Sequence, residues 1–157
     1  MIRKHLLFLF ALLLAACSVN TPRYQKGLAE QTAVAFFKNL SEGRYAEAAE
    51  MYAGDYMALA SLTSQVPPDD HAGLWKSGCE ISGLQCLSIH RIISTEKFSL
   101  NEFRITVEFR DMTGSVFVQG PCCGRTAAEM PPVSQFDVYV IERDGRYFAT
   151  SLPVITP

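Results

Sequence analysis

The spacing of the hydrophobic residues changes near Leu87, and this change constrains the fold more than any other feature of the chain. Before this point, hydrophobic residues recur every three or four positions, which is typical of amphipathic helices. After it, Phe103, Ile105, Val107 and Phe109 alternate with polar residues, which is typical of a strand with one buried face. The chain is therefore expected to begin with helices and to end with strands.

Three main helices and one shorter helical turn are expected in the first half. The first helix spans residues 27–40. The second spans residues 45–54 and ends at a glycine, and Asp55 is expected to cap the shorter turn. The third helix is expected to begin at the Pro-Pro-Asp-Asp segment of residues 67–70 and to stop at Gly78.

The second half is expected to form an antiparallel set of strands joined by turns and one long loop. An early strand is predicted within residues 87–98, and a short one at residues 115–119. Residues 120–132 contain glycine, two cysteines and tandem prolines and are expected to form a long loop. Residues 135–152 are predicted to form the last hairpin.

This hairpin has an unusual distribution of apolar residues. The Asp144-Gly145 pair favours a type I′ turn, which pairs Arg143 with Arg146. Both faces are then apolar, with Tyr139, Ile141, Phe148 and Leu152 on one face and Phe136, Val138, Val140, Tyr147 and Ala149 on the other. If one face of the hairpin were exposed to water, the residues on that face should be mostly polar. We expect the 120–132 loop to cover the second face and to leave the protein monomeric, with a two-fold dimer through that face as the alternative.

Two helical motifs carry a resemblance to a known superfamily. They read Ala33-x-x-Phe36-Phe37-x-x-Leu40 and Gly43-Arg44-Tyr45-x-x-Ala48-Ala49-x-x-Tyr52. Together with the strands that follow, residues 27–157 resemble the nuclear transport factor 2-like superfamily. The resemblance implies an α+β cone in which a curved antiparallel sheet wraps N-terminal helices around a cavity, with frequent dimerisation through the outer sheet face. Because members include isomerases, hydrolases, dehydratases, transport adaptors and extracytoplasmic lipoproteins, it implies little about function.

The first seventeen residues resemble a bacterial lipoprotein signal. Arg3 and Lys4 precede an apolar run over residues 6–14, and Leu-Ala-Ala-Cys ends at Cys17. The run would span only about 14 Å as a helix, roughly half of a bilayer core, so it is not expected to cross a membrane. The resemblance implies a diacylglyceryl group on the Cys17 sulfur, cleavage after Ala16, and a further acyl chain on the new N-terminus. An ordinary secretory signal with a chance cysteine is the alternative.

This signal leads to a prediction about organisation and location. We expect a signal peptide at residues 1–16, a lipidated tether at residues 17–26, and a single α+β domain at residues 27–157. Because two or three acyl chains hold a protein firmly on a bilayer, the mature protein is expected on the extracytoplasmic face of a bacterial membrane.

The charge of the chain argues against nucleic acid as a partner. The sequence has 14 Lys and Arg residues against 16 Asp and Glu residues. Processing would remove Arg3 and Lys4 and leave a formal charge of about −4, and no basic stripe or Lys/Arg run is present.

Four cysteines would remain in an oxidising compartment after lipidation of Cys17, and we expect them to form disulfides. Crossed pairs that join Cys79 and Cys86 to Cys122 and Cys123 are preferred, because a bridge between adjacent cysteines closes a small strained ring. The alternative is a local Cys79–Cys86 bridge with a vicinal Cys122–Cys123 bridge. Adjacent cysteines also lack the spacing of a four-thiolate zinc site, so no metal is expected.

The sequence is poor in catalytic patterns. His71 is expected to be a solvated residue near a helix start, and a metal site formed with Asp69 and Asp70 would need three adjacent side chains to converge. His90 lies in the early strand and is expected to be structural. No nucleophile elbow or glycine-rich phosphate loop is present in the sequence.

One acidic residue merits consideration as a catalytic base. If the Asp137 face of the hairpin lined a cavity, apolar surroundings would raise the carboxyl pKa, and Tyr139 would stabilise an oxyanion. The simpler interpretation places Asp137 near solvent or beside Arg104 or Arg110. The aromatic residues Trp75, Tyr56 and Phe98 could line a pocket, although a core position is expected for such spacing.

The sequence therefore favours a non-enzymatic, membrane-anchored lipoprotein that binds a partner protein or a small apolar ligand, with no cofactor. The alternative is an isomerase or hydratase that uses Asp137 and Tyr139 in a cavity.

Overall fold

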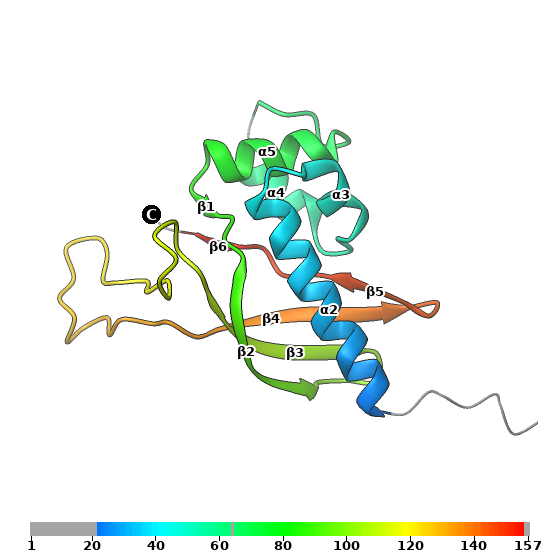
Figure 1. The fold of residues 1–157 in the computed structure, drawn as a ribbon. Coiled ribbons are helices and arrows are strands. Elements are labelled where there is room, and N and C mark those ends of the chain that lie inside the picture. Colours follow the sequence, from blue (N-terminus) through cyan, green and yellow to red (C-terminus); the bar gives the residue numbers. More distant parts are fainter. Residues whose placement is uncertain (1–21, 64, 156–157) are drawn as a thin grey trace, which may run out of the picture.

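Every helix precedes every strand in the described part of the chain, as the change in hydrophobic spacing predicts (Figure 1). The computed structural model describes residues 22–63 and 65–155, so the signal segment and Cys17 lie outside the described residues. The helices are α2 (Pro22–Ser41), α3 (Tyr45–Glu50), α4 (Tyr56–Leu62) and α5 (His71–Glu80). The strands are β1 (Leu84–Gln85), β2 (Ile89–Lys97), β3 (Glu102–Phe109), β4 (Phe136–Arg143), β5 (Arg146–Ala149) and β6 (Val154–Ile155).

Four strands form a curved antiparallel sheet in the order β2-β3-β4-β5, and β1 pairs with β6 beside it. The predicted register of the last hairpin is confirmed, because Arg143 lies opposite Arg146. Asp144 and Gly145 both have positive φ angles, 55° and 75°, as a type I′ turn requires. Two register irregularities in β2 accompany the curvature of this edge strand.

Helix α2 crosses the inner face of the sheet and packs against all four strands (Figure 1). Its buried residues share one face of the helix and are Ala29, Ala33, Phe36, Phe37 and Leu40. The Phe36 ring meets the Trp75 ring of α5 edge to face at 5.5 Å between centroids. One hydrophobic core therefore joins the helices to the sheet.

The inner face of the sheet is the face that we expected the 120–132 loop or a second subunit to cover. The apolar residues of this face all belong to the hydrophobic core or pack against it, namely Phe136, Val138, Val140, Tyr147 and Ala149. Val138, Val140 and Ala149 are buried. Figure 1 shows the loop running away from the sheet. The expectation of a loop-covered face is wrong because α2 occupies that face, and the argument for a dimer through it no longer holds.

Four predicted boundaries also differ from the structure. Helix α3 ends at Glu50 and not at Gly54, because the chain after it forms a bridge from Tyr52 to Ala149 of β5. Helix α2 begins at Pro22, inside the expected 17–26 tether, because proline suits the first turn of a helix. Helix α5 passes through Gly78, where an added Cβ would lie 2.6 Å from Leu84, so this glycine permits close packing and does not end the helix. Residues 115–119 form only isolated bridges and no strand.

Candidate functional site

An open pocket of about 700 Å³ lies where the C-terminal end of α2 meets the segment between α5 and β2. The remaining wall comes from the loop that follows β3. The lining residues are Leu40, Ser41, Tyr45, Cys79, Leu84, Gln85, Cys86, Leu87, Ser88, Arg110, Asp111, Met112, Thr113 and Phe117. A cavity of this volume is large enough for a small organic ligand.

The inner wall of the pocket is apolar. Leu40 and Leu84 are buried in the core, and Leu87 and Phe117 are half-buried against it. The hydrophobic surface that the half-buried pair presents can accept an apolar ligand without loss of core contacts.

The rim of the pocket is polar and carries one cation. Arg110 is the single Lys, Arg or His among the lining residues, and its side chain makes no ion pair with the described part of the chain. The neighbouring Asp111 is already engaged, since its Oδ1 accepts hydrogen bonds from Thr113 N at 2.8 Å, Thr113 Oγ1 at 2.7 Å and Ser115 N at 2.9 Å. These bonds hold the pKa of Asp111 below its ordinary value. Arg110 is therefore the group at the rim with an unused charge.

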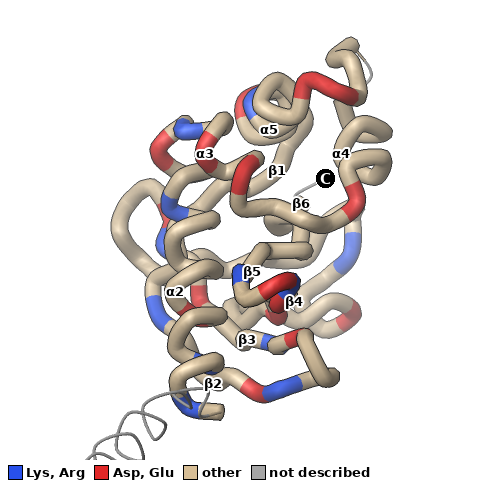
Figure 2. The backbone as a smooth tube through the Cα atoms, turned by 90° about the vertical axis from the view of Figure 1, so that its right-hand side faces the viewer, with Lys and Arg blue, Asp and Glu red and all other residues tan. Residues whose placement is uncertain are grey.

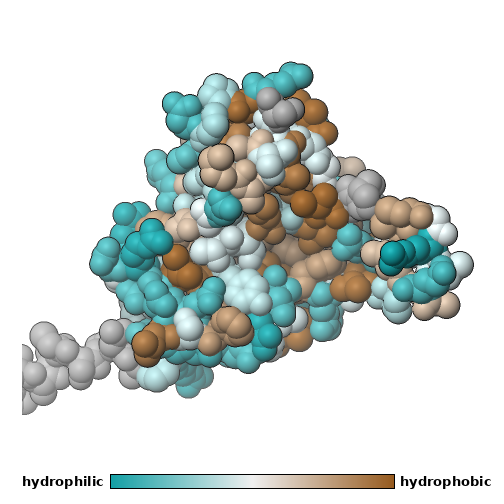
Figure 3. All heavy atoms as spheres, turned by 180° about the vertical axis from the view of Figure 1, so that it is seen from behind, coloured by the Kyte–Doolittle hydropathy of each residue, from teal (hydrophilic) through white to brown (hydrophobic). Residues whose placement is uncertain are grey.

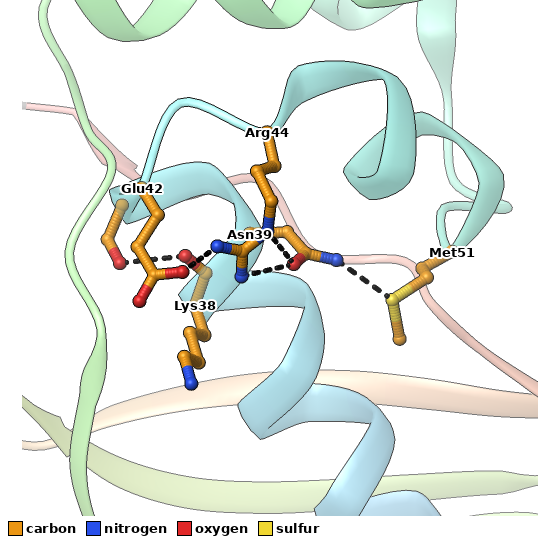
Figure 4. Close-up of polar contacts among 6 residues, drawn as sticks. Lys38, Asn39, Glu42, Arg44 and Met51 are labelled. Atoms are coloured by element: carbon orange, nitrogen blue, oxygen red, sulfur yellow. Dashed lines mark hydrogen bonds and ion pairs between the residues drawn. The ribbon is translucent and has the colours of Figure 1, made fainter.

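The junction of α2 and α3 positions Tyr45 at the pocket. Arg44 precedes α3 and donates from Nε and Nη2 to Asn39 Oδ1 at 2.9 and 2.7 Å, and it also pairs with Glu42 (Figure 4). The adjacent Gly43 has a φ of 72°, which favours glycine at this turn. Tyr45 Oη donates a hydrogen bond to Glu80 Oε1 at 3.2 Å. The pKa of Tyr45 is raised, mainly by its partial burial and to a smaller extent by the negative charge of Glu80.

The two residues of the catalytic alternative lie on the outer face of the sheet. The Asp137 side chain is 42% exposed, accepts a hydrogen bond from Thr106 Oγ1 at 2.7 Å, and lies 4.0 Å from Arg104 Nη1. Tyr139 packs edge to face on Phe98, which is itself exposed. The catalytic hypothesis required this face to line a cavity, and the described structure does not meet that condition. The neighbourhood matches the simpler interpretation, with Arg104 as the partner.

The two histidines lie on separate elements, and His71 is exposed at the start of α5, as expected. His71 stacks on Tyr56 with the ring centroids 3.7 Å apart, and the preceding Asp70 caps α5 by accepting from Gly73 N. His90 lies in β2, where its Nδ1 is buried without a hydrogen-bond partner in the described structure. Among the described residues, no three His, Cys, Asp or Glu side chains are arranged to hold a metal ion.

The three aromatic residues considered for a pocket, Trp75, Tyr56 and Phe98, differ in whether they lie in the core. Trp75 is fully buried and meets Tyr52 at 4.9 Å and Tyr56 at 6.4 Å between ring centroids, so the core interpretation is confirmed for it. Phe98 lies at the outer sheet face, under the guanidinium of Arg104. None of the three predicted aromatic residues lines the pocket.

The preferred cysteine pairing is wrong. Cys79 and Cys86 form a local disulfide between the end of α5 and the segment after β1, and both line the pocket. Cys122 and Cys123 are unbridged, with their sulfurs 2.8 Å apart. The crossed pairing does not form because the 120–132 loop extends away from this part of the molecule (Figure 1).

Removal of the Cys79–Cys86 disulfide is expected to destabilise the protein and loosen the pocket wall. The bridge joins residues seven positions apart. For so short a loop, the chain-entropy model gives about 2.5 kcal/mol of stabilisation. Urea unfolding of the Cys79→Ser/Cys86→Ser variant should show a loss of this size, while Cys122→Ser/Cys123→Ser should unfold like the wild type. Equal stability of both variants would contradict the local pairing.

A second prediction concerns pH. Glu108 is buried on the outer face of the sheet, and Arg91 Nε donates to its Oε2 at 2.6 Å. This hydrogen bond is the largest cause that lowers the pKa of Glu108, whereas desolvation opposes it. A lowered pKa in the folded state stabilises the fold above the ordinary glutamate pKa of about 4.3, and this contribution disappears as the pH falls through the lowered value.

Arg91→Ala is therefore expected to reduce the free energy of unfolding near neutral pH and to approach the wild type in acid. Urea unfolding at several pH values tests this expectation, with Arg143→Ala as a control at an exposed position without an ion pair in the described structure. A deficit that stays constant across the acid range would contradict the Arg91–Glu108 linkage.

Comparison with known proteins adds no family assignment, because neither a protein-family model nor a curated protein sequence matches the chain. No described helix has both the length and the apolar character needed to span a membrane. The pocket residues were not identified from the sequence, because they come from separated segments and share no motif or spacing. The one sequence feature that could have indicated the pocket was the charged Arg110-Asp111 pair directly after the strand of alternating polar and apolar residues.

Proposed function

We propose that the protein is an extracytoplasmic lipoprotein, anchored through Cys17, that binds a small ligand with an apolar body and an acidic end. The observation that carries the ligand proposal is the combination of an apolar wall with one unpaired cation at its rim, Arg110. An acidic group would meet Arg110 while the apolar body lies against Leu87 and Phe117. Charge-assisted hydrogen bonds of this kind give strong recognition of carboxylates.

Binding without catalysis is the function that the pocket chemistry supports best. The lining residues include one carboxylate, that of Asp111, which is occupied by a turn, and two cysteines, which are joined in a disulfide. A general acid or base needs a group free to exchange a proton with a substrate. The lining offers hydroxyl groups and a cation, which suit binding and orientation.

We also infer that the domain belongs to the nuclear transport factor 2-like superfamily. The support is the order of elements, with the helices before the strands, and the curved antiparallel sheet that wraps around α2. In that superfamily the cavity lies between the helices and the sheet, and the pocket of this chain is bounded by the end of α2 and by the segments that flank β1 and follow β3.

Replacement of Arg110 with glutamate is expected to weaken binding of an apolar carboxylate at least about tenfold, which corresponds to about 1.4 kcal/mol. The reason is that the cation at the rim becomes an anion. Titration with the fluorescent fatty acid cis-parinaric acid measures this affinity. Arg125→Glu makes the same charge change on an exposed position of the 120–132 loop and should bind like the wild type.

Two results would count against the proposed pocket. One is the absence of saturable binding by the wild type. The other is an equal loss of affinity in Arg110→Glu and Arg125→Glu, because net charge would then explain the effect without a specific contact.

A further inference from the structure

The N-terminal end of α2 and the turn between β2 and β3 lie at the same end of the molecule. Figures 1 and 2 show both at the bottom of the domain in two perpendicular views. The pocket confirms this orientation, because Leu40 near the end of α2 lines it together with Leu87 and Ser88, which directly precede β2. Helix α2 therefore runs opposite to β2, and Pro22 lies toward the far end of that strand.

The β2–β3 turn presents apolar side chains to solvent at this end. Leu100 is 93% exposed and Phe98 is 56% exposed. The turn is nevertheless ordered by hydrogen bonds, since the backbone N–H groups of Phe98 and Ser99 donate to Glu102 O at 2.8 and 3.2 Å. On α2, Tyr24 is 52% exposed. Figure 3 shows apolar side chains among hydrophilic ones along this lower end.

The length of chain before α2 limits which surface can face a membrane. Five residue steps separate Cys17 from Pro22, and an extended chain of this length spans at most about 18 Å. Helix α2 has 20 residues and is about 30 Å long. A lipid anchor on Cys17 therefore keeps the N-terminal end of α2 near the bilayer and cannot reach the opposite end of the helix.

We propose that the β2–β3 turn is a membrane-contact surface, in which Leu100 and Phe98 enter the interface of the phospholipid bilayer that holds Cys17. The inference rests on the proposed anchor and adds an orientation to it. Lys97, which precedes Phe98, is exposed, and its Nζ lies 5.8 Å from the centroid of the Phe103 ring. A lysine beside interfacial apolar side chains can extend to the level of the lipid phosphates. The pocket at the other end of α2 then lies up to about 30 Å from the membrane.

Tryptophan placed at the turn reports this contact directly. The full-length, lipidated protein carrying Leu100→Trp is reconstituted in vesicles of phosphatidylethanolamine and phosphatidylglycerol that include lipids with brominated acyl chains. Ile81→Trp is the matched control, because Ile81 is 81% exposed, follows α5 at the opposite end of the domain (Figure 1) and does not line the pocket. The native Trp75 is buried in both variants and gives the same background.

Bromine is expected to reduce the emission of the tryptophan added in Leu100→Trp by about twofold, since interfacial side chains reach the acyl boundary. The emission of the tryptophan added in Ile81→Trp is expected to stay unchanged. Equal quenching of the two variants on protein that floats with the vesicles would overturn the contact surface and leave the anchor intact. A blue shift of Leu100→Trp without quenching would overturn it in favour of a second copy of the chain. Protein that fails to float would overturn the anchor and, with it, the orientation.

Discussion

Replacement of Cys17 with alanine is expected to remove the lipid anchor and to stop maturation between Ala16 and residue 17. In the lipoprotein signal that residues 3–17 resemble, the diacylglyceryl group is attached to the sulfur of this cysteine, and alanine has no such atom. Each buried methylene contributes about 0.8 kcal/mol to membrane binding, so the loss of two or three acyl chains is a very large change. Intact mass and membrane fractionation measure both effects.

The matched control for this experiment is Ser18→Ala, which alters the neighbouring residue and leaves the thiol in place. Inhibition of lipoprotein signal peptidase with globomycin should reproduce the processing defect in the wild type. If Cys17→Ala is cleaved like Ser18→Ala, gains the same added mass and stays on the membrane to the same extent, the chain is not a lipoprotein.

Truncation of Trp75 to alanine is expected to cost about 3–5 kcal/mol of stability, the range for deletion of a large buried aromatic side chain. Trp75 is fully buried at the centre of the aromatic contacts that join α5 to α2 and to the segment after α3. The neighbouring rings of Phe36 and Tyr52 cannot close the space without moving α2 and the segment after α3. A domain of ordinary stability would be left marginal by this change.

Urea unfolding followed by circular dichroism measures this loss, because the variant lacks the single tryptophan of the chain. Trp75→Phe keeps much of the volume and is expected to lose clearly less, and Met112→Ala at an exposed position should be neutral. A Trp75→Ala loss no larger than that of the exposed variant would show that the helices and the sheet do not share one core.

The sequence predicted local features well because they depend on neighbouring residues. The Asp144-Gly145 turn fixed the Arg143–Arg146 register without any information from distant segments. Asp55 and Asp70 were predicted at helix starts, and both accept hydrogen bonds from the first turn of the helix that follows. Such signals are a property of a few adjacent residues.

The features that depend on tertiary packing were harder to predict. Which face of the last hairpin is buried depends on where α2 docks, and a pattern that is apolar on both faces does not decide it. The disulfide pairing depends on the path of the 120–132 loop, which short-range signals do not specify. Glycine often marks the end of a helix, yet Gly78 lies inside α5, where the absence of a side chain lets Leu84 pack closely.

The difference between local signals and tertiary packing also explains why the pocket was not predicted from the sequence. Asp137 and Tyr139 were considered together because they are two residues apart on one strand, and they do share a face, but that face is solvent-exposed. Arg110 and Leu87 are neighbours in the pocket because Ser88 O accepts a hydrogen bond from Arg110 N at 2.9 Å, where the start of β2 pairs with the end of β3. Only the register of those two strands brings them together.

The most direct test of the proposed binding site is paramagnetic NMR on residues 18–157 in solution, without a bilayer around Phe98, with a spin-labelled fatty acid. We predict broadening of backbone signals from Leu87, Ser88 and Phe117, which surround the pocket, and its loss in Arg110→Glu. Signals of Tyr139 on the outer sheet face should remain sharp. Broadening that is centred on Tyr139, or that persists unchanged in Arg110→Glu, would contradict ligand binding in this pocket.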